Sequence, residues 1–522
     1  MSRKGKYSNC LGLFPRPVPR FPDALVRHHV NALPVEPKKR NQSAEHAEGR
    51  RDKVALRHVV WIHSHWIGFA AKTPSEDSRG LFLGVLMANL FTAEVVQKPK
   101  LSSIGRAPMA GNPHGRHHRA AMAKSSDVVA NLLLPALDAL AQVAPAAAVE
   151  RRRRMAKNPA TFVRGSLILH VAWLAANPLA EAPWVWSIGD AHLGNFATLA
   201  TGPLNRNGIS PVTYGVADVD DEHPAPWQWD GVRLLASLGV MLDKDGGGRK
   251  HLVRLTHALL GDYVRVLTAA TDDDEHAERI DFHGLPEALK AAINDDAEPE
   301  RLMAHRLALI AGQRLRPGPS CVVDAVERRL LQPAVEAALA TVAPAKELRV
   351  LDFARRISGG GLASLGRRRW WVLVQERDRE CMWAPRLLEL KERRPSVLSA
   401  ILPAQPFAPS STRPWTLPMG GDRWQCRVPL GFGDALLRTR CQARTVLDPT
   451  TMDEGDLLRL VRLWGQLLAV AHLTSARGLG LPAKKQATAI VVNAKRHADA
   501  VAEQAWNLVT WTRDAYREFI KA

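Results

Sequence analysis

The chain has 522 residues, 46% of them hydrophobic, and a formal net charge of +19. That length allows two to four domains or lobes, and the apolar share is ordinary for a globular protein with a sizeable core. The five cysteines are scattered without paired spacing, which argues against a zinc module or a disulfide framework and favours the reducing cytoplasm.

The first 125 residues carry most of the net positive charge. They contain 21 Lys and Arg but 8 Asp and Glu, so 13 of the 19 excess charges lie there. Proline, histidine and arginine are frequent and apolar periodicity is poor, so we predict that residues 1–125 are disordered or loosely packed. A basic tail is more often a solvated segment than a recognition surface, and we do not expect nucleic acid as the partner.

Membrane segments are not expected either. The longest apolar run, Leu81–Phe91, falls short of the ~20 residues that cross a bilayer. The apolar piece Cys10–Phe14 is too short for the core of a signal peptide.

Elements with clear periodicity begin after residue 125. Val128–Val143 predicts a helix despite Pro135, Leu167–Ala176 predicts a helix or strand, and Trp184–Ile188 predicts a short buried strand. The later elements that we predict are a loop at Gly189–Asn195, a strand at Val212–Val219, a helix at Asp230–Asp243, a hairpin across Arg355–Val374, a strand at Leu387–Lys391 and amphipathic helices at Asp456–Thr474 and Ala489–Lys521.

The sharpest feature is a polar loop and an acidic segment, each after a predicted strand. The loop Gly189–Asn195 reads GDAHLGN, and the segment Ala217–Glu222 reads ADVDDE. Loops at strand ends commonly display functional side chains. A DxxxxN pattern also arises by chance, and Asp-rich loops are often solvated turns. The flanking apolar strands and the clustered acids favour a functional site.

Phosphoryl transfer requires such a set of side chains. A carboxylate accepts the proton of the attacking hydroxyl, while a second carboxylate and an amide oxygen hold Mg²⁺ on the nucleotide phosphates. In kinases the Asn follows the catalytic Asp by five positions, and the metal-binding Asp comes later. Asp190, Asn195 and Asp218 have this order and spacing, and Asp220 is a candidate second metal ligand. Hard oxygen atoms suit Mg²⁺.

Four motifs together resemble a bacterial family known only as domain of unknown function twenty-two fifty-two. They are FxRG at Phe162–Gly165, GDAHxxNF at Gly189–Phe196, DFDE at Asp218–Asp221 and PWxWD at Pro226–Asp230. The GDxHxxN loop before an acidic strand also resembles the aminoglycoside-phosphotransferase-like branch of the protein-kinase-like superfamily. The resemblance implies an α+β, two-lobed kinase-like fold, with ATP and Mg²⁺ as cofactors and a small-molecule or protein hydroxyl as acceptor.

Three positions depart from these patterns. Ala217 stands where the family usually has Asn, the acidic segment reads DVDD, and Ile188 stands where many kinases have a histidine. That histidine is generally structural, so Ile188 is compatible with catalysis. The departures leave open whether catalysis is retained.

The phosphate-binding parts of a kinase have candidates only downstream of Asp190. The run 358–366 is glycine-rich, and glycines let backbone N–H groups approach phosphates. Its candidate residues are Gly359, Gly360, Gly361 and Gly366. Lys391 ends a short apolar run and is the candidate strand lysine. A flexible turn and a surface lysine are the plain alternatives, and a contact between Lys391 and a carboxylate would favour the site.

The order of these parts predicts a circularly permuted kinase-like fold. The helix at residues 463–478 resembles the one that leads into the catalytic loop in ordinary kinases, yet here it comes after that loop. We therefore expect a helix-rich large lobe at 126–344, a small antiparallel-sheet lobe at 345–440 and a helical remainder of the large lobe at 441–522. Neighbouring chain termini make such a permutation physically feasible.

Several side chains near the loop have open roles. His192 is a candidate general base or metal ligand, but such a residue more often hydrogen-bonds its own loop. Asp230 could be catalytic, but the resemblance to kinases implies a buried structural anchor that accepts backbone N–H groups of the loop, and we prefer that role. We expect Asp221, Glu222 and His223 to be solvated. Arg164 could meet a phosphate or pair with an acid.

Two other functions compete with phosphoryl transfer. A metallophosphoesterase is suggested by GDAH, but no convincing GNH or GHxH ligand motif follows Asp218. The other alternative is a catalytically inactive kinase-like protein that binds nucleotide or acts as a scaffold.

Overall fold

The structure, a computed structural model, describes residues 124–522 apart from 201–210, 243–247, 272–284, 298–308, 319–320, 343–347, 358–360, 378–382, 403–423, 441–444 and 480. All described residues belong to Ala93–Ala522, one of two units into which the chain divides. The region 1–125, for which we predict disorder or loose packing, lies almost wholly outside the described residues.

Helices form the larger share of the described chain. Their bounds are α3 Ser125–Val128, α4 Leu134–Val143, α5 Pro145–Met155, α6 Pro159–Gly165, α7 Leu167–Ala176, α8 Gln228–Leu242, α9 Arg249–Thr271, α10 Glu287–Ala297, α12 Ala325–Leu339, α13 Glu454–Gly478 and α14 Ala483–Lys521. The segment Leu167–Ala176, which the sequence leaves as helix or strand, is a helix. Pro135 is accommodated because it lies in the first turn of α4, directly after a π-helical turn.

The strands in the described part of the chain form one main sheet and three small pairs. The pairs are β1 Trp184–Ser187 with β4 His223–Pro226, β2 Phe196–Ala200 with β3 Val212–Val216, and β5 Ile310–Ala311 with β6 Arg314–Leu315. The main sheet is antiparallel with the order β11-β12-β10-β9-β8-β7. Its strands are β7 Cys321–Val322, β8 Leu348–Arg356, β9 Arg369–Arg377, β10 Trp383–Glu392, β11 Cys426–Leu430 and β12 Gly433–Thr439. The α+β class predicted from the sequence is confirmed.

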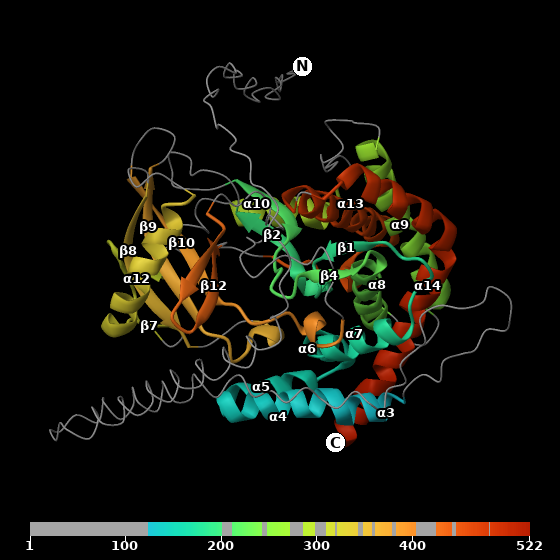
Figure 1. The fold of residues 1–522 in the computed structure, drawn as a ribbon, viewed down its shortest axis with the longest axis horizontal. Coiled ribbons are helices and arrows are strands. Elements are labelled where there is room, and N and C mark those ends of the chain that lie inside the picture. Colours follow the sequence, from blue (N-terminus) through green and yellow to red (C-terminus); the bar gives the residue numbers. More distant parts are fainter. Residues whose placement is uncertain are drawn as a thin grey trace, which may run out of the picture. The chain divides into compact units, whose positions relative to one another are not determined.

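One helix packs on the main sheet, and it lies before the residue predicted as the start of the sheet region. The apolar side chains of α12, including Leu331 and Val335, share a core with Trp370 of β9 and Val428 of β11. Figure 1 shows α12 lying over the yellow strands. Helix α12 packs on this sheet, and strand β7 pairs with β8. The sheet region therefore begins before residue 345, the start predicted from the sequence.

The other core is made by long helices. Helix α9 packs against both α13 and α14, and α14 also packs against α8 (Figure 1). Close approach depends on glycine: a Cβ at Gly465 of α13 would lie 2.2 Å from the carbonyl oxygen of Leu259 in α9. This core carries the short β1–β4 pair, which contacts α13 and places the loop after β1 beside the start of α8.

Among the described residues, up to two helical segments are long and apolar enough to cross a membrane. Ser125–Val143 passes by length and composition, as do Pro159–Gly165 and Leu167–Ala176 if that bent pair is one span. The apolar side chains of the first segment, such as Val129 and Leu133, pack in the core with α7 and α14. Buried core helices pass the same test, so the expectation that no segment spans a membrane stays a prediction.

Candidate functional site

The loop Gly189–Asn195 is anchored by Asp230, in the first turn of α8. The Asp230 carboxylate accepts hydrogen bonds from the backbone N–H of Ile188 (2.7 Å) and Gly189 (3.1 Å) and from the Ser187 hydroxyl (2.9 Å). His472 Nε2 of α13 lies 3.1 Å from the same carboxylate. Asp230 is 1% exposed, and its surroundings are those of a buried anchor.

Asp190, the candidate base, is also buried, but its two carboxylate oxygens have different surroundings. Its Oδ1 accepts hydrogen bonds from the Arg233 guanidinium of α8, one of them at 2.9 Å from Nε. Its Oδ2 lies 3.7 Å from His192 Nε2. Burial raises the pKa of Asp190 to about 6, although the nearby Arg233 opposes this shift. Arg233 is not among the site residues predicted from the sequence, although it follows Asp230 by three positions on the same helix face.

His192 and Asn195 shape the loop from within. His192 Nδ1 accepts a hydrogen bond from the backbone N–H of Gly194 at 2.9 Å, as expected for a loop-forming histidine. Asn195 Nδ2 donates to the carbonyl oxygen of Asp190 at 2.8 Å. That bond leaves the amide oxygen of Asn195 available for a ligand.

The loop contacts the acidic segment at Gly189. This residue has φ of +82°, and a Cβ there would lie 1.9 Å from the carbonyl oxygen of Asp221. Only glycine fits both the left-handed backbone and the close approach.

The acidic segment is more buried than expected. Asp221 and Glu222 are each 3% exposed, so the expectation that they are solvated is wrong. Asp221 accepts from the backbone N–H of Val397 at 3.0 Å. Glu222 accepts from Trp186 Nε1 and from Arg393, both at 3.0 Å. Their partners come from distant parts of the chain, which explains why the local pattern resembles a solvated turn.

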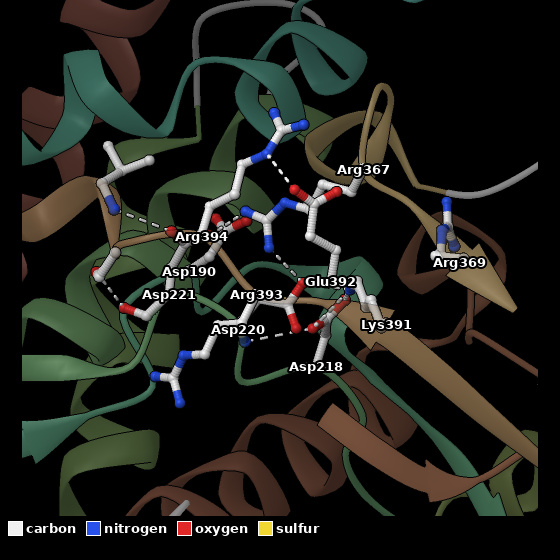
Figure 2. A network of polar contacts seen from close by, with 12 residues as sticks. Asp190, Asp218, Asp220, Asp221, Arg367, Arg369, Lys391, Glu392, Arg393 and Arg394 are labelled. Atoms are coloured by element: carbon white, nitrogen blue, oxygen red, sulfur yellow. Dashed lines mark hydrogen bonds and ion pairs between the residues drawn. The ribbon is translucent and has the colours of Figure 1, made fainter. Parts of the chain in front are cut away.

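Cations from the main sheet converge on Asp218 and Asp220. Lys391 of β10 is 1% exposed, and its Nζ lies 3.0 Å from Asp218 Oδ2 and also pairs with Asp220. Arg367 Nη1, from the connection between β8 and β9, lies 2.7 Å from Asp220 Oδ2. Figure 2 shows Lys391 beside Asp218, with Arg369 standing apart. Burial and the neighbouring Asp218 raise the pKa of Asp220, while Lys391 and Arg367 oppose the shift.

Several of the side chains described above line one cleft, which has about 360 Å³ of empty space, part of it open to solvent. Its lining residues are Arg164, Asp190, His192, Asn195, Asp218, Asp220, Asp221, Gly361, Leu362 and Ser364. The structure thus brings Gly361 of the predicted phosphate loop to the acidic groups, whereas Gly359 and Gly360 lie outside the described residues. Gly366 is not in this lining; a Cβ there would lie 2.7 Å from Leu140 Cδ1 of α4, so it packs on a helix instead.

The donor set is compatible with magnesium. Asp218, Asp220 and the free amide oxygen of Asn195 line one cleft and offer hard oxygen atoms. A cation there would compete with Lys391 for the two carboxylates. Among the described residues no three His, Cys, Asp or Glu side chains form a metal-binding group.

The three fixed residues of the FxRG motif each have a different structural role. Phe162 is buried against the rings of Tyr516 and Phe519 in α14. A Cβ at Gly165 would lie 2.5 Å from the Met155 side chain, so this glycine allows close packing. Arg164 points into the cleft.

The fold and the cleft define an α+β protein with an acidic site where a helical core meets an antiparallel sheet. The chain belongs to the family described as "Uncharacterized protein conserved in bacteria (DUF2252)", whose model matches residues 143–522. No curated protein and no solved structure matches the chain.

Proposed function

We propose that this protein transfers a phosphoryl group from ATP, with Mg²⁺, to a hydroxyl group of a small molecule or protein. One observation carries the proposal. Lys391 reaches Asp218 and Asp220 at the cleft that also holds Asp190 and Asn195. These are the residue types, in the same combination, that kinases use for phosphate, metal and proton.

Asp190 is the proposed proton acceptor. The acceptor oxygen bonds to the γ-phosphorus, the bond from that phosphorus to the bridging oxygen breaks with its electron pair leaving on ADP, and the hydroxyl proton goes to Asp190. A pKa of about 6 makes the carboxylate a stronger base than an exposed aspartate, yet leaves it mostly ionised at neutral pH. Arg233 holds Oδ1 and so leaves Oδ2 for the substrate.

The remaining groups are proposed to hold the nucleotide. Magnesium would neutralise phosphate charge, with Asn195 and Asp218 as its ligands and Asp220 as a second carboxylate. Lys391 would bind the phosphates once the metal takes a share of the aspartates. Backbone N–H groups near Gly361, which lines the same cleft, would cover the phosphates.

The order of the elements supports a circularly permuted kinase-like fold. In kinases the glycine loop covers the phosphates and the lysine lies on the third strand. Here the glycine run joins β8 to β9, and Lys391 lies on β10, the third strand of that series. Helix α13 comes late in the chain but lies beside β1, and its His472 reaches Asp230 at the base of the loop.

Calorimetric titration of the full chain with ATP, with and without Mg²⁺, tests the proposal. We expect Mg²⁺-dependent binding that Asp218→Ala weakens at least tenfold. Asp138→Ala, an exposed position on α4, should bind like wild type. Absence of ATP binding to the wild-type chain under both conditions would refute the proposal.

A second candidate is nucleotide binding without transfer. It is favoured by the two cations, Lys391 and Arg367, that already occupy Asp220. Release of labelled phosphate from ATP separates the two functions. Turnover that Asp190→Asn abolishes supports transfer, whereas MgATP binding without any turnover or labelled product supports the second candidate.

A further inference from the structure

Arg164 occupies the wall of the cleft next to the candidate base. It lies in the last turn of α6, and its guanidinium covers the backbone of Gly194. A Cβ at Gly194 would lie 3.0 Å from the guanidinium carbon of Arg164 and 2.9 Å from the ring of His192. The guanidinium therefore rests on the same loop that carries Asp190.

The end of α6 is held firmly in this position. Phe162 is fully buried against α14, and Gly165 packs against Met155. Arg151 of α5 donates a hydrogen bond from Nη2 to the carbonyl oxygen of Gly165 at 2.7 Å. Because both ends of the motif are fixed, Arg164 is positioned before any ligand arrives.

Arg164 differs from the other cations of the site in having no partner within the described chain. Arg233 pairs with Asp190, Arg367 with Asp220, and Lys391 with both Asp218 and Asp220. For Arg164 the structure contains no ion pair or hydrogen bond of the guanidinium with any described residue. Desolvation lowers its pKa, while Asp190 opposes the shift, yet the residue remains accessible. Such a guanidinium is suited to an oxyanion.

We propose that the phosphoryl acceptor carries an anionic group, a phosphate or a carboxylate, and that Arg164 binds that group. This inference rests on the proposed function. Lys391 reaches Asp218 and Asp220 from β10 of the sheet, where the nucleotide phosphates are proposed to lie. Arg164 belongs to the helical side and rests on the Asp190 loop. An anion held by Arg164 would place a neighbouring hydroxyl of the same molecule at Asp190.

The test is calorimetric titration of the full chain with two anions, orthophosphate and malonate, at constant ionic strength. The chain is first saturated with Mg²⁺ and a non-hydrolysable ATP analogue, which fills the nucleotide site. We expect at least one anion to bind, and the tighter of the two identifies the acceptor group as phosphate or carboxylate. Arg164→Gln should weaken that binding at least tenfold, and Arg164→Lys, which keeps the charge but loses the planar fork, should weaken it less.

Arg329→Gln is the matched control, because Arg329 is exposed on α12 and loses the same charge. It should bind the anion like wild type. The inference is overturned if neither anion binds beside the analogue, if Arg164→Gln binds as wild type does, or if the anion binds only when the analogue is absent. The last result would assign Arg164 to the nucleotide phosphates. Failure of the analogue itself to bind would instead overturn the proposed function.

Discussion

The loop Gly189–Asn195 and the acidic segment Asp218–Glu222 touch each other, but they are supported by different parts of the molecule. The loop depends on the helical core, through Asp230 and Arg233 of α8. The acidic segment depends mainly on the sheet region, through such groups as Lys391 of β10.

The difference separates support by the helical core from support by the sheet. The loop is held by residues of α8 that lie 41 to 43 positions further along the chain, and it contacts the acidic segment only at Gly189 among the contacts described above. The acidic segment takes its geometry from the sheet, with Arg438 of β12 also donating to the carbonyl oxygen of Ala217 at 3.1 Å. Changes to the loop support should therefore reduce global stability, and changes to the sheet cations should act mainly on the site.

The largest effect is expected from Asp230→Ala. The substitution leaves two backbone N–H groups, the Ser187 hydroxyl and His472 without their buried acceptor. At about 1–3 kcal/mol for each unsatisfied group, the free energy of unfolding should fall by at least about 4 kcal/mol. Denaturant unfolding measures it. Asp138→Ala should change it by less than about 0.5 kcal/mol; a similar loss in both variants would contradict an anchoring role.

Gly189→Ala should come next, with a loss of about 3 kcal/mol. The new Cβ would meet the Asp221 carbonyl oxygen and would force alanine into a positive φ. Gly261→Ala is the matched control, because a Cβ at Gly261 in α9 meets nothing within 4 Å. That substitution should stabilise the protein by up to about 1 kcal/mol through helix propensity. Equal thermal shifts for the two variants would show that Gly189 is not constrained.

Arg367→Gln removes one sheet-side cation and should cost about 2 kcal/mol. The loss is smaller because Lys391 still neutralises Asp220. Unfolding curves of this variant and of Arg329→Gln provide the comparison. If Arg367→Gln costs more than Gly189→Ala, the acidic segment contributes to global stability as strongly as the loop does.

The smallest expected effect is the contribution of Glu389 to the pH dependence of the free energy of unfolding. Glu389 pairs with Arg438, which in turn holds Ala217. Burial acts to raise the pKa of Glu389, but the combined attraction of Arg438, Arg440, Lys391 and Arg369 lowers it. A lowered folded pKa contributes stability that is complete above the unfolded value, near 4.3, and is lost as pH falls toward the folded value.

Wild type should therefore lose about 0.6 kcal/mol from this residue alone between pH 7 and pH 4. Glu389→Gln should lack that part of the pH dependence, and Glu336→Gln, exposed on α12, should retain it. Unfolding free energies at several pH values give the difference. Identical pH profiles for wild type and Glu389→Gln would contradict the lowered pKa.

Much of the local structure could be predicted from the sequence. The alternation and apolar runs predict β1, the strand carrying Lys391 and the long helices α13 and α14, all of which are present. The resemblance to kinases predicts the anchoring role of Asp230, which lies in the first turn of α8. The roles of Asp221, Glu222 and Gly366 could not, since each is decided by a partner from another region.

The sequence by itself determined the short elements that carry Asp190, Asn195 and Asp218, because periodic apolar burial and hydrogen bonds within a few residues, such as that between His192 and Gly194, act locally. Only the tertiary structure decided that Lys391 meets Asp218 and that Arg164 faces the cleft without a partner in the described chain. The physical reason is that these relations depend on how the helical core and the sheet pack together. That packing is a sum over many distant contacts and leaves no mark in any short stretch of sequence.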